Sequence, residues 1–153
     1  MIIEEYMREH KWIKICLEEA KKAFKAGEVP VGAVIVKDQK IIARAHNRVE
    51  RLKDPTAHAE ILALKKAFEK TGHKHLKGCT MYVSLEPCAM CAYAIILARI
   101  DRLVFLAQNE RAGAVMNLYN LLDDIRFNHR VRWEYKPVEE AKLLLERFFS
   151  RLR

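Results

Sequence analysis

Three consecutive segments near the middle of the chain alternate between strand-like and helix-like composition. T-M-Y-V-S-L at 80–85 and R-L-V-F-L-A at 102–107 are short apolar runs typical of buried strands. Between them lies C-A-M-C-A-Y-A-I-I-L-A-R at 88–99, a nearly all-apolar helical stretch. Because a strand, a helix and a second strand in this order usually pair in parallel, the sequence predicts an α/β fold with side chains converging at strand-to-helix junctions.

The flanking segments complete a layered fold. Residues 3–26 repeat apolar positions at helical spacing, and Gly27 provides a C-terminal stop. Two β-branched runs at 29–36 and 41–46 predict an antiparallel hairpin. The other expected elements are helices at 56–70, 114–124 and 138–152 and an edge strand at 131–135. Together they predict a three-layer α/β/α sandwich with a mixed five-stranded sheet, as one domain over 1–153.

Composition narrows the class of protein. The chain has 153 residues, and 28 Lys and Arg exceed 20 Asp and Glu for a net charge of +8, which suits a polyanionic partner. No run approaches the ~18 apolar residues of a membrane span, so we expect no membrane association and a cytoplasmic location. Four cysteines are few for a disulfide scaffold and favour metal or redox chemistry.

Three side chains have the spacing of metal ligands. Cys88 and Cys91 are three residues apart, so both thiols leave one helix face near its first turn, which Pro87 is suited to open. His58 lies near the start of the preceding helix, where Thr56 can cap. One His and two Cys leave the fourth position of tetrahedral zinc to water, which is the pattern of a catalytic site.

A base is needed beside such a site, because two thiolates weaken the acidifying effect of zinc on its water. Glu60, two residues from His58, can take that proton. Two alternatives remain open from the spacing: a redox pair in C-A-M-C, and a closed structural zinc with Cys79 as the fourth ligand.

H-A-E at 58–60 and P-C-A-M-C at 87–91 resemble the H-x-E and P-C-x-x-C motifs of the zinc-dependent cytidine and adenosine deaminase superfamily. The resemblance implies a cytidine deaminase-like fold. It also implies one zinc ion per subunit held by His58, Cys88 and Cys91, with Glu60 as the proton shuttle.

Longer stretches are similar to the bacterial tRNA-specific adenosine deaminases. The matching segments are G-E-V-P-V-G-A-V-I-V at 27–36, H-N at 46–47, D-P-T-A-H-A-E-I at 54–61, L-E-P-C-A-M-C-A at 85–92, N-H-R-V at 128–131 and F-F-S-R-L-R at 148–153. This resemblance implies conversion of the wobble adenosine of a tRNA anticodon to inosine. Zinc-activated water would attack C6 of a flipped-out adenine.

The resemblance also assigns substrate contacts. It implies that Asn47 hydrogen-bonds the base, that Glu28 and Val31 line its pocket, and that the flanking nucleotides meet Arg111, Asn128 and Phe149. Asn109 stands where bacterial members often carry Asp, and we hypothesise that Asn109 makes single-stranded DNA a better substrate than Asp would.

The expected partners are the tRNA anticodon stem-loop and a second copy of the chain. A homodimer is implied by the family and would cover the outer face of the apolar helix at 91–98. Phosphate contacts are expected from the C-terminal third, through Arg126, Arg130, Arg132, Lys136, Lys142, Arg147, Arg151 and Arg153. Two rival functions stay open: a free base or nucleoside deaminase of the guanine or cytosine type, and a non-catalytic RNA-binding subunit with structural zinc.

Overall fold

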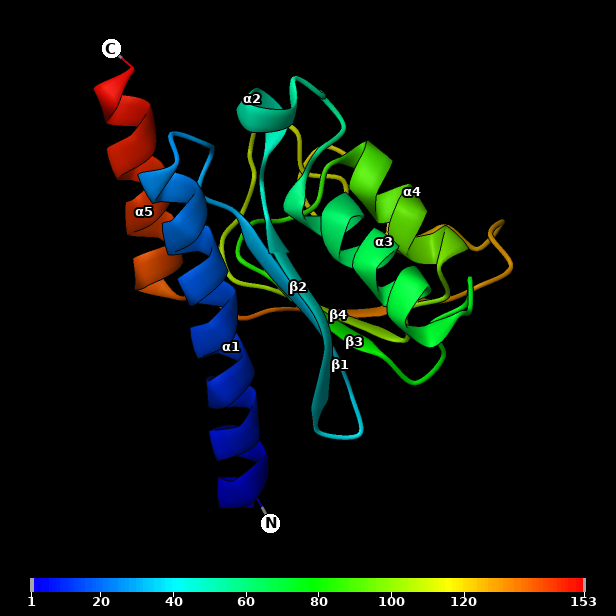
Figure 1. The fold of residues 1–153 in the computed structure, drawn as a ribbon. Helices are drawn as coiled ribbons and strands as arrows, with labels where there is room; N and C mark the ends of the chain where they lie inside the picture. The colour runs from blue at the N-terminus through cyan, green and yellow to red at the C-terminus, as the bar shows by residue number, and fades with distance from the viewer. Residues whose placement is uncertain (1, 153) are drawn as a thin grey trace.

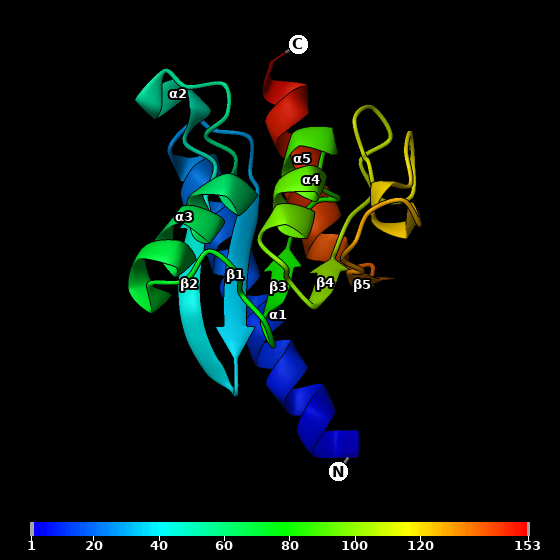
Figure 2. The same ribbon diagram turned by 90° about the vertical axis from the view of Figure 1, so that its right-hand side faces the viewer.

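A computed structural model describes residues 2–152 and places five strands in one sheet, in the order β2-β1-β3-β4-β5 (Figure 2). The strands are β1 Gly32–Lys37, β2 Lys40–His46, β3 Thr80–Val83, β4 Arg102–Phe105 and β5 Arg132–Tyr135. β1 is antiparallel to both β2 and β3, whereas β3, β4 and β5 run parallel. The predicted mixed five-stranded sheet is confirmed.

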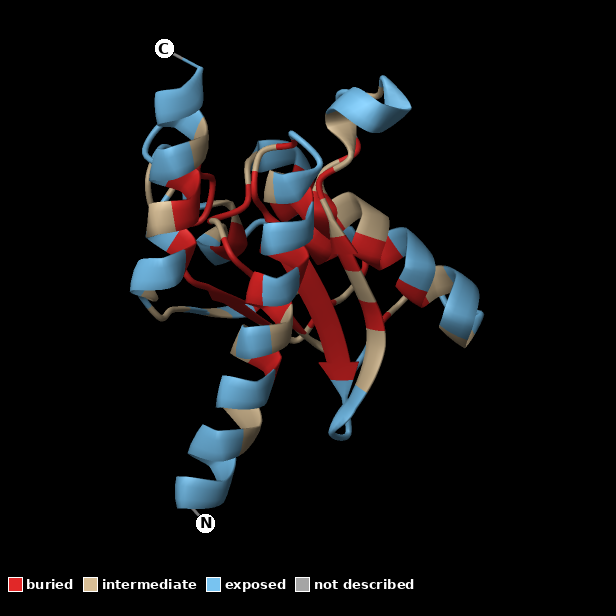
Figure 3. Ribbon diagram, turned by 60° about the vertical axis from the view of Figure 1, so that its left-hand side comes forward, coloured by how far each residue is buried: buried red, intermediate tan, exposed pale blue. Residues whose placement is uncertain are grey.

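Helices cover both faces of the sheet (Figure 1). α1 (Ile2–Lys25) packs on β1, β2 and β3, and α5 (Glu139–Arg151) lies beside it on the same side. α3 (Ala59–Thr71) packs on β2 and β1 from the other side, with α4 (Ala89–Leu97) next to it. The three-layer sandwich predicted from the sequence is therefore present, and its buried residues follow the sheet and the inner helix faces (Figure 3).

α1 and β1 approach each other closely at one glycine. A Cβ added at Gly32 would lie 2.3 Å from the carbonyl oxygen of Cys16, so no other residue fits there. The Cys16 thiol also donates to the Gly32 carbonyl at 3.2 Å. This contact fixes α1 against the strand that leads to the pocket described below.

Two helix starts differ from the prediction. α3 begins at Ala59 and not at Thr56, because the amide and hydroxyl of Thr56 both bind the Asp54 carboxylate in a turn. α4 begins at Ala89, so Pro87 precedes the helix and does not open it. As a result His58 and Cys88 occupy the N-cap positions of α3 and α4 in extended conformation.

The helix predicted at 114–124 is wrong. Within it only Leu121–Asp123 (η1) forms a turn of 3₁₀ helix. The backbone amides of Val115, Met116 and Asn117 donate to the Glu86 carboxylate, at 3.1, 2.8 and 3.1 Å, and so are unavailable to an α-helix.

A short helix that the sequence did not predict, α2 (Val49–Leu52), follows β2. Its first amides, those of Glu50 and Arg51, donate to the carboxylate of Glu28 at 3.0 and 2.9 Å. No helix between residues 2 and 152 has both the length and the apolarity needed to cross a membrane.

Candidate active site

The N-terminal ends of α3 and α4 bring three donor atoms together. His58 Nδ1 lies 3.6 Å from Cys88 Sγ and 3.5 Å from Cys91 Sγ, and the three donor atoms lie within 4.8 Å of one another. Bond lengths of about 2.0 Å to nitrogen and 2.3 Å to sulfur place tetrahedral N and S ligands of zinc about 3.5 Å apart. The donor set and its spacing therefore fit a zinc ion.

The composition of this cluster also bears on the two alternatives that the spacing left open, a redox pair in C-A-M-C and a structural zinc with Cys79 as the fourth ligand. Among the described residues it contains no fourth His, Cys or acidic ligand, and Cys79 is a buried free thiol outside it. A hydrogen bond from Cys91, together with one from His58, lowers the pKa of the Cys88 thiol to about 4. Cys88 is thus poised as a thiolate, the form that binds metal.

Glu60 lies in the first turn of α3, beside the cluster but outside it. Its side chain is only 4% exposed, and burial raises the pKa of its carboxyl to about 7 in the metal-free chain. It interacts electrostatically with His58 and Cys88. A dication bound by these residues would favour the carboxylate form of Glu60, which is the form that can accept a proton.

A cavity of about 1540 Å³ opens above these residues. Its lining includes His58, Glu60 and Cys88. It also includes six of the seven predicted substrate-binding residues: Glu28, Val31, Asn47, Asn109, Arg111 and Phe149. The seventh, Asn128, is exposed in the loop before β5 and does not line the cavity.

Asn47 and Glu28 are held by backbone amides in the cavity wall. Asn47 Oδ1 accepts the amide of Ala59 at 2.7 Å, which fixes the amide orientation and ties Asn47 to the helix that carries Glu60. No hydrogen bond from Asn47 Nδ2 occurs within residues 2–152, which leaves this donor for a ligand. The Glu28 carboxylate is engaged by α2 and so shapes the rim on that side.

Asn109 and Arg111 reach the cavity from the segment after β4, and Phe149 reaches it from α5. Asn109 Oδ1 accepts the amide of Ala112 at 3.1 Å, so its side chain helps to form its own loop. Arg111 is exposed. Phe149 projects from α5, 42% exposed, with its ring edge-on to Phe148 at 5.4 Å.

Some lining residues were missed from the sequence. They come from α2 and from the segment after β4, and include Val49, Glu50, Leu106, Ala107 and Gln108. The signal that could have found the second group is the position of 106–112 directly after a parallel strand.

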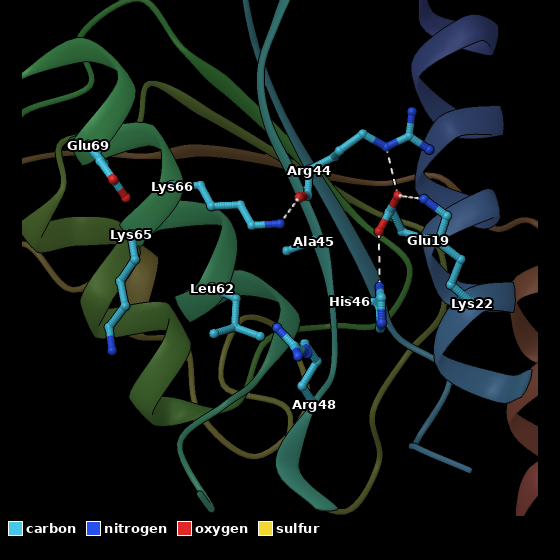
Figure 4. Close-up of a pocket in the computed structure, with 10 residues that line it drawn as sticks. All are labelled: Glu19, Lys22, Arg44, Ala45, His46, Arg48, Leu62, Lys65, Lys66 and Glu69. Carbon is cyan, nitrogen blue, oxygen red and sulfur yellow. Dashed lines mark hydrogen bonds and ion pairs between the residues drawn. The ribbon is translucent and has the colours of Figure 1, made fainter. Parts of the chain in front are cut away.

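Several of the C-terminal basic residues expected to contact phosphates already interact with other side chains of the protein. Arg126 pairs with Asp124, Lys136 with Glu9, and Arg151 lies over the Phe24 ring at 4.4 Å. Arg153 lies outside the described residues. A second basic region, not predicted, surrounds a smaller hollow of about 350 Å³ lined by Glu19, Lys22, Arg44, Ala45, His46, Arg48, Leu62, Lys65, Lys66 and Glu69 (Figure 4).

That hollow contains an acidic centre. The buried Glu19 carboxylate accepts from Lys22 Nζ at 2.8 Å, Arg44 Nε at 2.7 Å and His46 Nδ1 at 3.1 Å (Figure 4). Lys66 donates to the Arg44 carbonyl at 2.9 Å on the outer edge of β2. Lys66 belongs to α3, so a charged side chain from that helix occupies a backbone acceptor of this edge strand.

Residues 7–153 match the model of the MafB19-like deaminase family. The tRNA-specific adenosine deaminase of Aquifex aeolicus is 54% identical over 147 residues, which cover 96% of this chain and 97% of that protein. The chain belongs to the tRNA-specific adenosine deaminase family.

Solved structures agree with this deaminase assignment. A structure from a study of A-to-I editing by tRNA:A34 deaminases at the wobble position of transfer RNA superposes with a TM-score of 0.86 at 39% identity, covering 89% of this chain and 99% of that one. Guanine deaminase from Bacillus subtilis superposes less closely, with a TM-score of 0.63 at 30% identity, covering 92% and 93%. The fold of the deaminase is therefore shared between RNA-acting and free-base enzymes.

Proposed function

We propose that the protein is a single-domain, zinc-dependent hydrolase that deaminates the wobble adenosine of a tRNA anticodon to inosine. The observation that carries the proposal is a His58, Cys88 and Cys91 cluster beside a buried acid, in a chain 54% identical to a tRNA-specific adenosine deaminase. His58 and Cys88 of this cluster, together with Glu60, line the large cavity.

The dimensions of the cavity favour a macromolecular substrate over a free base. Pockets for small molecules usually enclose about 300–1000 Å³, and this cavity exceeds that range at about 1540 Å³. It runs from the cluster along α5, where Lys142, Leu145 and Phe149 line it. A flipped-out adenine at the floor would leave room for flanking nucleotides along α5, including a base stacked on Phe149.

Each residue of the site has a defined task in the proposed reaction. When bound by His58, Cys88 and Cys91, zinc supplies an activated water molecule. Glu60 would carry one proton of the attacking water to N1 of the adenine and the other to the departing amino group, so that ammonia would leave C6 as the carbonyl of inosine forms. Asn47 Nδ2 donates to the base, and Val31 packs against it.

The cysteine ligands of the proposed zinc ion indicate the cellular compartment. Cys88 and Cys91 must remain reduced to bind zinc, which fits the reducing cytoplasm, where tRNA is also found. We therefore place the enzyme in the cytoplasm.

An apolar surface supports a homodimer. The exposed large side chains Met90, Tyr93 and Leu97 of α4 adjoin a loop that exposes Leu118, Tyr119 and Ile125, and the rings of Tyr93 and Phe127 lie 5.5 Å apart. Contiguous apolar surface of this kind marks protein interfaces.

Analytical sedimentation measures the oligomeric state and so tests the dimer. We expect the wild type to be a dimer and Tyr93→Glu to be a monomer. Tyr6→Glu, at an exposed site on α1, is the control and should remain a dimer. Monomers in all three would contradict the dimer.

The decisive experiment measures inosine formed in a synthetic anticodon stem-loop containing a wobble adenosine, with zinc content determined for each protein. We expect inosine from the wild type and none from Glu60→Ala with equal zinc. Cys88→Ser should lose zinc and activity together, whereas Cys79→Ser should keep both. If the wild type forms no inosine but deaminates guanine or cytosine, the free-base alternative is correct.

A further inference from the structure

One rim of the cavity has almost no regular secondary structure of its own. After β4 the chain runs from Leu106 to Asn117 without a helix or strand, and residues 106–112 line the cavity along this path. This segment, which we name the rim loop (106–117), carries Asn109 and Arg111. A loop without a backbone ladder needs other partners to hold its amides.

The partner is one buried carboxylate. Glu86, 1% exposed, accepts the amides of Val115, Met116 and Asn117 at Oε2. At Oε1 it accepts the amide of Asn109, at 3.2 Å, and the side-chain amide of Asn117. A single side chain thus binds amides in both halves of the rim loop, and within residues 2–152 Glu86 forms no ion pair.

The loop wraps tightly around this carboxylate. A Cβ added at Gly113 would lie 2.4 Å from Glu86 Cδ and Oε2, so only glycine permits the approach. The backbone on each side is also joined, because the Glu86 amide donates to the Ala107 carbonyl at 2.9 Å and the Ala114 amide donates to the Pro87 carbonyl at 2.8 Å. The carboxylate and the two flanking bonds therefore hold the rim loop in one position.

Glu86 cannot itself act as a proton shuttle in this arrangement. Both of its oxygens are used by amide donors, and its side chain is almost fully buried. Glu86 is among the residues that line the cavity, but its oxygens are occupied, so its effect on a substrate passes through the residues that it holds, Asn109 and, through the same loop, Arg111.

We infer that Glu86 is a positioning residue that fixes the rim loop for the nucleotides flanking the reacting adenosine, and so sets the affinity for the stem-loop. The inference rests on the proposed function, since it takes the stem-loop as substrate. It predicts an effect on KM and not on the chemistry at His58, Glu60, Cys88 and Cys91.

The test is Glu86→Gln, which keeps the shape of the side chain. An amide has one acceptor oxygen, so its NH₂ group must face amide donors at whichever end it points to. We expect KM for the stem-loop to rise roughly tenfold, with kcat changed less than about threefold and zinc content unchanged. Hydrogen exchange at the amides of 109 and 115–117 should become faster.

Two further variants provide a second test of the inference and a control. Asn117→Ala removes one side-chain donor and leaves the carboxylate in place, so it should raise KM by less than Glu86→Gln does. This variant tests the inference even if Glu86→Gln does not fold. Glu19→Gln alters an equally buried carboxylate that is absent from the cavity lining, and it should leave KM unchanged.

The possible outcomes separate this inference from the proposed function. An unchanged KM in both Glu86→Gln and Asn117→Ala would overturn the inference, as would loss of zinc from Glu86→Gln. A wild type that forms no inosine would instead refute the proposed function. In that case, unchanged hydrogen exchange in Glu86→Gln would show separately that the carboxylate does not hold the loop.

Discussion

Two buried carboxylates, Glu19 in the basic hollow and Glu60 in the large cavity, have nearly equal exposure, at 3% and 4%. Their surroundings differ completely. Glu19 accepts hydrogen bonds from Lys22, Arg44 and His46. Burial alone would raise the pKa of Glu19, but these bonds lower it to about 2.

Among residues 2–152 Glu60 has no such set of cations, and burial raises its pKa to about 7. The difference teaches that burial alone does not decide the charge of an acid. Cations around Glu19 fix a permanent charge that holds α1 to β2, whereas no neighbouring set of cations fixes the charge of Glu60 among residues 2–152.

The largest expected effect comes from giving both sites the same substitution. Glu60→Gln should lower kcat on the stem-loop by roughly 10²–10⁴-fold, because the amide cannot transfer the proton. Glu19→Gln should leave kcat within about threefold. Steady-state kinetics on the two purified variants at equal zinc content makes the comparison, and equal losses at both sites would remove the functional distinction between them.

A second prediction concerns stability, for which the substitution of Glu19, and not that of Glu60, should have the larger effect. Glu19→Gln should lower the free energy of unfolding by about 2 kcal/mol near neutral pH, because the amide faces three donors and lacks the charge. Since the folded pKa of Glu19 is depressed to about 2, its contribution is complete above its ordinary value of 4.5. It is lost as the pH falls from about 4.5 toward 2.

Urea unfolding at several pH values checks the direction of this pH dependence of stability. The wild type should lose more stability than Glu19→Gln between about pH 4.5 and 2, so that the two curves converge in acid. Parallel curves over that range would mean that Glu19 does not carry the depressed pKa.

Much of this arrangement could be predicted from local sequence patterns. Helical periodicity gave α1, α3, α4 and α5, and the short β-branched runs gave the sheet. The motifs at 58–60 and 87–91 placed the ligands at two helix starts, and the structure brings the donors of His58, Cys88 and Cys91 together.

Two of the errors, the wrong helix at 114–124 and the missed α2, share one physical cause. The segment 114–124 has helical composition, but the amides of Val115, Met116 and Asn117 are taken by Glu86, which lies about thirty residues earlier. In the same way α2 forms where Glu28 binds its first amides from 22 and 23 residues away. A carboxylate that binds distant backbone amides leaves no periodic signal, so local patterns could not reveal it.

The smallest expected effect concerns the charge on the rim loop. Asn109→Asp keeps the acceptor that binds the Ala112 amide but loses the amide donor that points at the Glu86 carbonyl, at 3.5 Å. The added charge repels a nearby phosphate by about 0.7 kcal/mol at 6 Å in water. A ribose 2′-OH can donate to the new carboxylate and offset this, whereas DNA cannot.

We therefore expect Asn109→Asp to lower deamination of a single-stranded DNA hairpin roughly threefold relative to the RNA stem-loop. Gln108→Glu is the matched control, because it adds the same charge to the next residue of the same rim. An equal loss in Gln108→Glu would assign the effect to charge in general. If DNA turnover is the same in Asn109→Asp as in the wild type, Asn109 has no role in the choice between the two nucleic acids.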